Sequence, residues 1–141
     1  MAKFGQFIHR VKEDVTVAFN TSYGSDKKIT VNLNQIDDGA NSSIVRRSAV
    51  YSGNIQLIRI KGTVSGSATQ VTLKGYTDSA GNDLLLPPSV GTLEPSVDGT
   101  SHSVVFRVNA YHAAETSSIN LFCKTNTGTF TASEVLITWY E

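Results

Sequence analysis

The sequence predicts an all-β protein, a single antiparallel β-sandwich or barrel that spans residues 1–141 and has about eight strands. Two observations lead to this prediction. Apolar and polar residues alternate over short runs, which is the period of a strand with one buried face. Turn-forming residues separate these runs at intervals of roughly 8–12 residues, as in sandwiches and barrels.

Several runs show the alternation clearly, namely residues 15–19, 29–33, 71–73, 104–110 and 119–123. The last run, residues 134–140, is apolar on both faces, which is typical of a strand covered on two sides or facing a partner. The phase of the alternation shifts between Leu57 and Ile58, which predicts a β-bulge in the strand around residues 55–61.

Turn chemistry predicts how some of these strands are joined. The tripeptides Ser65-Gly66-Ser67 and Asn126-Thr127-Gly128 each separate two runs, and we expect each to close a hairpin. Residues 78–100 contain all three prolines of the chain and predict a long loop. Loops of this length are often docking elements, so Leu84, Leu85 and Leu86 are candidate partner contacts.

The N-terminal segment, residues 1–13, fits two structures. Phe4, Phe7, Ile8, Val11 and Val15 follow the spacing of a helical stripe. The glycine at position 5 and the lack of a capping residue favour an extended arm or edge strand instead. In either case, we expect Phe4, Phe7 and Ile8 to contact a partner.

The composition excludes several classes of protein. Twelve basic and twelve acidic residues give zero net charge, which argues against a nucleic-acid-binding protein. No apolar run approaches the roughly 20 residues that span a bilayer, so we expect no membrane association. No apolar core of about 7–15 residues follows the first residues, so we expect no secretory signal peptide.

Residues capable of catalysis or metal binding do not form a motif. Asp98, Ser101 and His102 precede a predicted strand and are typical of a turn. Cys123 alternates with apolar neighbours and is expected in the core. The three histidines are far apart in sequence, without metal-ligand spacing. We therefore expect no enzymatic activity, no cofactor and no metal ion.

The charges are unevenly distributed along the chain. Residues 1–61 hold nine basic and five acidic residues, whereas residues 62–141 hold three and seven. If the two halves stayed apart in space, the molecule would be a dipole able to pair head to tail.

In style, the chain resembles small structural proteins of tailed bacteriophages and related viruses. The resemblance rests on the Met1-Ala2-Lys3-Phe4-Gly5 start, the Ser- and Thr-rich strands and the ending Leu136-Ile137-Thr138-Trp139-Tyr140. It implies a jelly-roll-like sandwich in a virion assembled in the host cytoplasm, with the major capsid protein or other virion proteins as partners.

The resemblance favours a capsid decoration, or cement, protein that is a homo-oligomer, such as a trimer. A receptor- or glycan-binding module of a fibre or tail, or a penton (vertex) protein, is the alternative. No functional residue can be carried over from the resemblance.

Overall fold

A computed structural model describes residues 8–23, 28–32, 35–37, 44–46, 53–77, 80–112 and 118–140. Over these residues the chain forms strands and no helix. The strands are β1 (Ile8–Phe19), β2 (Lys28–Asn32), β3 (Gln35–Asp37), β4 (Ile44–Arg46), β5 (Gly53–Ser65), β6 (Gln70–Tyr76), β7 (Leu84–Thr92), β8 (Glu94–Pro95), β9 (His102–His112), β10 (Ser118–Thr125) and β11 (Thr129–Tyr140).

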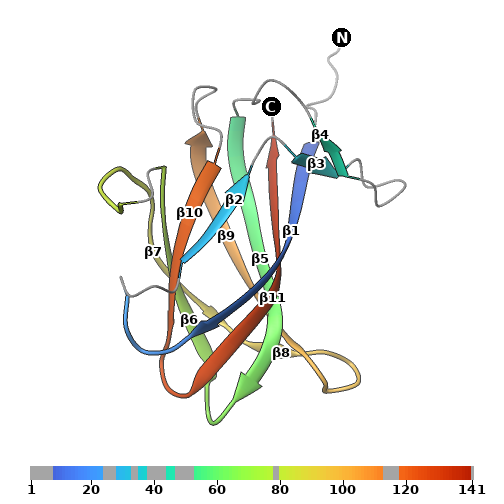
Figure 1. The fold of residues 1–141 in the computed structure, drawn as a ribbon, viewed down its shortest axis with the longest axis vertical. Helices are drawn as coiled ribbons and strands as arrows, with labels where there is room; N and C mark the ends of the chain where they lie inside the picture. The colour runs from blue at the N-terminus through green and yellow to red at the C-terminus, as the bar shows by residue number, and fades with distance from the viewer. Residues whose placement is uncertain are drawn as a thin grey trace.

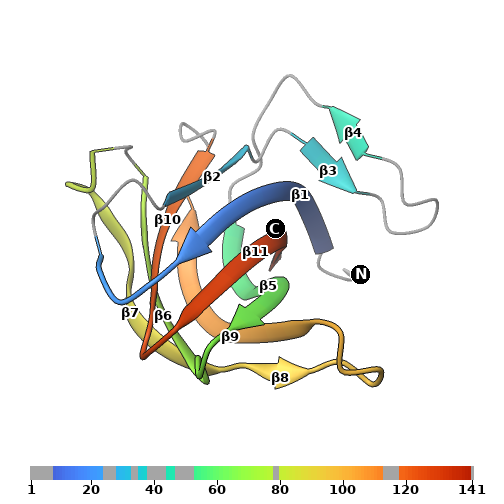
Figure 2. The ribbon, with the colours of Figure 1, turned by 60° about the horizontal axis from the view of Figure 1, so that its bottom comes forward.

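The strands form two antiparallel sheets that face each other (Figures 1 and 2). One sheet has seven strands in the order β4-β3-β1-β11-β5-β9-β8, and the other has four in the order β2-β10-β6-β7. Without the short strands β3, β4 and β8, each sheet has four strands, in the orders β1-β11-β5-β9 and β2-β10-β6-β7. Among these eight strands, strands that are consecutive along the chain lie in opposite sheets, except β6 and β7, which pair with each other. This is the jelly-roll arrangement, so the predicted sandwich is confirmed.

The core lies between the sheets and is made by the alternation seen in the sequence. In β6 the buried positions are Val71, Leu73 and Gly75, and the residues between them face outward. The largest fully buried side chains are Phe19, Phe130, Ile29, Ile55, Ile58, Ile60, Leu73, Leu86, Ile119 and Leu121. Cys123 is also buried in this core, as predicted, and burial raises the pKa of its thiol.

The two predicted hairpins are wrong. The Gly66 turn joins β5 to β6, and the Gly128 turn joins β10 to β11, but in each case the two strands belong to different sheets. Both glycines have positive φ, 76° and 64°, so both segments are turns, as predicted. Only the predicted pairing of the flanking strands is wrong. Each turn is a corner at which the chain crosses the sandwich.

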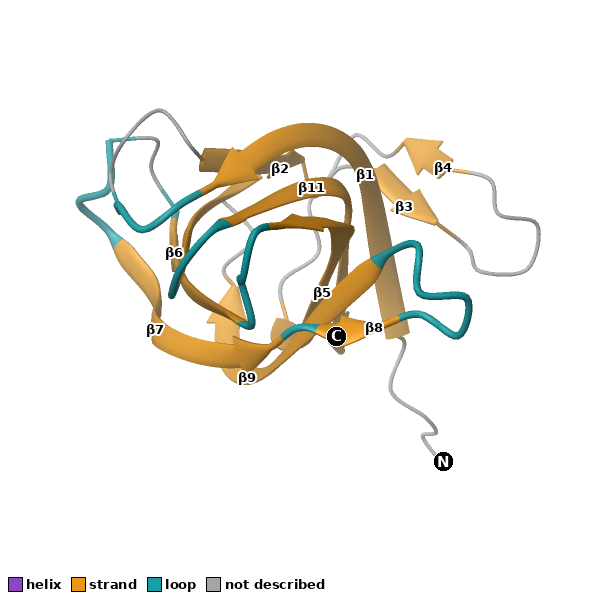
Figure 3. Cartoon of the chain, turned by 90° about the horizontal axis from the view of Figure 1, so that it is seen from below, coloured by secondary structure: helices purple, strands orange, loops and turns teal. Residues whose placement is uncertain are grey.

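The two corners lie side by side at one end of the molecule (Figure 3). The Asn126 side chain joins them: its Oδ1 accepts hydrogen bonds from the backbone N–H groups of Thr69 and Gln70, both at 3.1 Å. Its Nδ2 donates to Thr69 Oγ1 at 2.7 Å. One asparagine therefore satisfies three groups of the opposite corner, which fixes this end of the sandwich.

The helix alternative for the N-terminal segment is wrong for the part that the structure describes. Residues from Ile8 onward form β1, which pairs with β11 from Ile8↔Tyr140 to Phe19↔Phe130. The edge-strand alternative fits most of β1, because its other side is paired only at Arg10, with Asp37 of β3, among the described residues. Phe4 and Phe7 lie outside the described residues.

The predicted bulge in β5 is confirmed one residue earlier than expected. In the pairing with β11, Ile55 and Leu57 lie opposite the consecutive residues Trp139 and Thr138, so β5 carries one extra residue at this point. This leaves Ile55, Ile58 and Ile60 all buried, at no more than 1% exposure. The condition for a charge dipole is not met, because both sheets combine strands from residues 1–61 with strands from residues 62–141.

Candidate functional site

One side of the sandwich is open where the outer strands of the two sheets face each other. β7 is the last strand of the four-stranded sheet. β9 is covered on its outer side by β8 only at Ser103 and His102, among the described residues. A groove of about 380 Å³ lies between β7 and β9, lined by Leu85, Leu86, Pro87, Ser89, Arg107, Val108 and Ala110.

The predicted contact residues Leu84, Leu85 and Leu86 border this groove, but they do not lie in a loop. The long loop expected over residues 78–100 is wrong, because this stretch contains β7 and β8. Leu84 is 54% exposed, Leu85 is half-buried in the groove wall, and Leu86 is 1% exposed and belongs to its floor. Leu86 is therefore mainly a core residue, packed closely over Gly75.

Exposed apolar side chains lie on both strands beside the groove and in the turn between β8 and β9. Among the described residues, the large apolar side chains that are exposed are Leu84 (54%), Val90 (62%), Val97 (110%) and Val105 (38%). Leu84 and Val90 lie on β7, Val105 lies on β9, and Val97 lies in the turn between β8 and β9. Leu84 and Val90 lie opposite Tyr76 and Thr72 of β6, so both are on the outer face of the four-stranded sheet, and this exposed part of β7 beside the groove is a candidate interaction surface.

The edge of β7 carries two exposed prolines, Pro87 and Pro88. Proline has no backbone N–H to donate, so a strand that contains proline cannot form a complete set of backbone hydrogen bonds with a neighbouring strand on that side. The two prolines therefore protect this edge against unspecific strand pairing. A partner at the groove is expected to be held mainly by side-chain contacts.

Asp98 organises the turn before β9 and does not form a catalytic group with Ser101 and His102. Its Oδ1 accepts hydrogen bonds from Ser96 Oγ at 2.6 Å, Thr100 Oγ1 at 2.8 Å and the Thr100 backbone N–H at 3.1 Å. The Ser96 hydroxyl also accepts from the Ser101 backbone N–H at 3.3 Å. Asp98 thus plays the part expected of an aspartate in a turn.

These hydrogen bonds lower the pKa of Asp98 to about 2 from its ordinary value of 3.8, with the Ser96 hydroxyl as the largest cause. Because the folded pKa is the lower one, the stabilisation of the turn is present above about pH 3.8 and is lost as the pH falls through about 2. We expect a carboxyl NMR titration to give a midpoint near 2, and Ser96→Ala to move it toward 3.8. Ser103→Ala, on β9, is the control, and a midpoint near 3.8 in the unmodified protein would contradict this account.

The described residues contain no group of three or more His, Cys, Asp or Glu side chains close enough to hold a metal ion. Within the same part of the chain, no helix has the length and hydrophobicity needed to cross a bilayer.

A second cluster, which sequence analysis missed, lies on the outer face of the four-stranded sheet. Lys74 on β6 places its Nζ 4.3 Å from the centroid of the Tyr23 ring and 5.7 Å from that of Tyr76. Lys124 on β10 places its Nζ 4.8 Å from the same Tyr23 centroid. Tyr76 in turn meets Phe122 edge to face, with ring centroids 5.3 Å apart.

The residues of this cluster were not recognisable from sequence because Tyr23 is far from Lys74 and Lys124 along the chain. The only available signal was the period of two, which puts Lys74 and Tyr76 on one face of β6 and Phe122 and Lys124 on one face of β10. The antiparallel register, with Phe122 opposite Lys74, brings the two faces together.

Comparisons with known proteins identify no family. No protein-family model matches the chain, and no curated protein matches it. Among solved structures, the chain is similar to a family two carbohydrate esterase from Cellvibrio japonicus, with a TM-score of 0.36 and 11% identity. The match covers 97% of this chain and 36% of that protein, so the chain spans little more than a third of its length.

Proposed function

We propose that this protein is a structural component of a virus particle, and specifically a decoration protein that binds and stabilises the capsid shell. The observation that carries the proposal is the exposed apolar surface of the edge strand β7, beside the β7–β9 groove, on a jelly-roll scaffold. Leu84 and Val90 are more than half exposed and lie on the same edge strand. Jelly rolls recur in virion proteins, and a module of this kind acts by burying such surface against the shell.

The partner in this proposal is the major capsid protein or another virion protein. The groove offers apolar walls from Leu85 and Val108, and the exposed Arg107 provides one cation for a carboxylate of the partner. Phe4, Phe7 and Ile8 remain proposed additional contacts. Copies of the chain are proposed to form a homo-oligomer, such as a trimer, on the shell.

A binding assay with particles that lack the protein tests the exposed surface of β7. We expect the double variant Leu84→Ser, Val90→Ser to bind such particles at least about tenfold more weakly, because two exposed apolar contacts are lost. Val97→Ser is the matched control, since Val97 is fully exposed but lies in the turn between β8 and β9 and not on β7. Equal binding by the double variant and the unmodified protein would contradict docking at this surface.

Counting copies in purified particles by mass spectrometry separates the proposed roles. A copy number comparable to that of the major capsid protein supports decoration. A much smaller number, matching the vertices or the tail, supports a penton protein or a receptor- or glycan-binding module of a fibre. Absence from the particle would contradict the proposal as a whole.

The N-terminal contacts need a separate variant. Deletion should stop at residue 7, because Ile8 already pairs with Tyr140 in the sheet and its loss would disturb the fold. Unchanged capsid binding by a chain without residues 1–7 would exclude Phe4 and Phe7 as contacts.

A further inference from the structure

The four-stranded sheet has an unusual charge distribution. Its strands β2, β10, β6 and β7 contain three lysines, Lys28, Lys74 and Lys124, and contain no arginine, aspartate or glutamate. Each of these lysines, on β2, β6 and β10, is on the outer face, because its neighbour Ile29, Leu73 or Cys123 is buried. The outer face of this sheet is therefore cationic, although the whole chain has no net charge.

Two of these lysines are held close together. Both ammonium groups lie within 5 Å of the centroid of the Tyr23 ring, so they are at most about 9 Å apart. Neither ammonium group has a carboxylate within 4.0 Å among the described residues. Because no described carboxylate compensates them, these two like charges repel each other, and a bound anion would remove this repulsion.

Polar groups surround the two cations. Thr72 lies opposite Lys124 in the sheet, and Asn120 lies opposite Tyr76, where its Oδ1 accepts a 2.7 Å hydrogen bond from Thr30 Oγ1. The Tyr23 hydroxyl is enclosed near Thr72 without a hydrogen bond of good geometry to any described residue. Burial raises the pKa of Tyr23, and the Thr72 side chain only partly opposes this, so the hydroxyl stays protonated at neutral pH.

We propose that the outer face of the four-stranded sheet binds an anionic polysaccharide, with the ammonium groups of Lys74 and Lys124 holding its carboxylate or sulfate groups. The uncharged hydroxyl groups of Thr30 and Thr72 on the same face suit sugar hydroxyls, whereas Asn120 and the Tyr23 hydroxyl are buried and serve to support this surface. Nucleic acid is the less favoured polyanion, because the strands of this sheet contain no arginine that could bind phosphate through a bidentate pair of hydrogen bonds. This inference does not depend on the capsid role, because it is tested with polysaccharides in place of particles and with lysine variants that leave Leu84 and Val90 unchanged.

The test measures the retention of the purified protein on immobilised heparin, a sulfated polysaccharide, and its binding to polygalacturonate, a carboxylated one. Uncharged dextran is the control for charge, and a single-stranded DNA is the control for polymer class. We expect binding to both anionic polysaccharides at low salt, weakened as salt increases, and no binding to dextran.

Variants place the binding on the sheet. Lys74→Gln combined with Lys124→Gln is expected to weaken binding about tenfold or more, since two charge-assisted contacts are lost. Lys12→Gln combined with Lys61→Gln is the matched control, because both lysines lie on strands of the seven-stranded sheet. This control is expected to bind as the unmodified protein does, and thermal unfolding should confirm that both double variants are folded.

Three results would overturn the inference. The first is the absence of binding to either anionic polysaccharide. The second is an equal loss in the control variant, which would mean that binding follows total charge and not this face. The third is tighter binding to DNA than to the polysaccharides through the same two lysines, which would make nucleic acid the ligand.

Discussion

Replacing Phe130 with alanine is expected to lower the free energy of unfolding by about 3–5 kcal/mol. Phe130 has no exposed surface, and its ring packs against that of Phe19, with the centroids 6.3 Å apart. The two residues are also direct partners in the β1–β11 register. Loss of the ring leaves a cavity where the first and last described strands meet, and urea unfolding measures the cost.

Two further variants keep this prediction testable if Phe130→Ala does not fold. Phe130→Leu fills most of the space and is expected to cost less than about 1.5 kcal/mol. Val97→Ala, at a fully exposed side chain, is expected to change stability by no more than about 0.5 kcal/mol. A cost for Phe130→Ala as small as that for Val97→Ala would show that the core is not packed as described.

Replacing Gly62 with alanine is expected to destabilise the protein by about 3 kcal/mol, although the change adds only one methyl group. Gly62 pairs with Ala132 next to the bulge in β11, where the register shifts between Ala132 and Glu134. A Cβ at position 62 would overlap the backbone carbonyl oxygen of Thr131. Because the obstacle is backbone in the middle of a sheet, neither strand can move aside without loss of pairing.

Gly99→Ala is the matched control for this variant. Gly99 has a φ of 74°, which is unfavourable for alanine, but a Cβ there would meet no atom within 4 Å. We expect it to cost about 1 kcal/mol, from backbone strain alone. Thermal or urea unfolding of the two variants side by side decides the matter, and equal costs would contradict the close approach of β5 and β11.

The sequence was most informative where a strand has one buried face. Val71 and Leu73, or Ile119 and Leu121, alternate with polar residues, so the buried face of each strand could be predicted directly. The spacing of Val11 and Val15 was misleading because residues four apart lie on one face of a strand as well as on one face of a helix, so it did not distinguish the two structures.

The strand pairing could not be predicted from the turns. A glycine with positive φ, such as Gly66 or Gly128, reverses the chain equally well in a hairpin and in a corner between sheets. What selects the corner is the partner on each strand: β5 is already flanked by β11 and β9, and β6 by β10 and β7. These partners are distant in sequence, and no local pattern indicates them.

The sequence indicated residues on one of the two strands that line the groove, β7, but not those on β9. Leu84, Leu85 and Leu86 were recognised as contact candidates, but Pro87 and Pro88 suggested a loop, since proline is rare inside sheets. On an edge strand its missing N–H costs nothing, and β7 is an edge strand. The β9 wall, with Arg107 and Val108, depends on how the two sheets face each other, which alternation alone does not specify.

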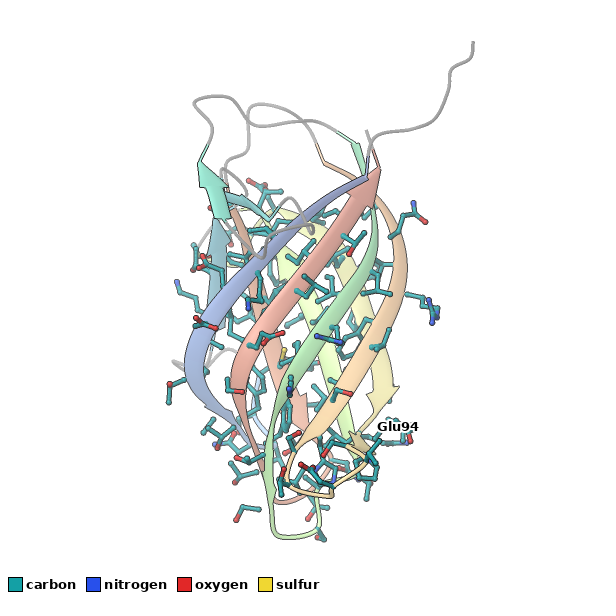
Figure 4. All side chains as sticks on the ribbon, turned by 90° about the vertical axis from the view of Figure 1, so that its right-hand side faces the viewer. Glu94 is labelled. Carbon is teal, nitrogen blue, oxygen red and sulfur yellow. The ribbon has the colours of Figure 1, made fainter. Side chains whose placement is uncertain are left out.

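The position of β11 has a consequence for biosynthesis. This strand comes last among those described, yet it lies inside the seven-stranded sheet, between β1 and β5 (Figure 4 shows this sheet from outside, with Glu94 of β8 at its lower end). While the ribosome is still making the earlier strands, β1 and β5 have no strand between them and their facing edges are unpaired. The nascent chain must therefore keep two strand edges from pairing wrongly until β11 has left the ribosome, and folding is completed only after that moment.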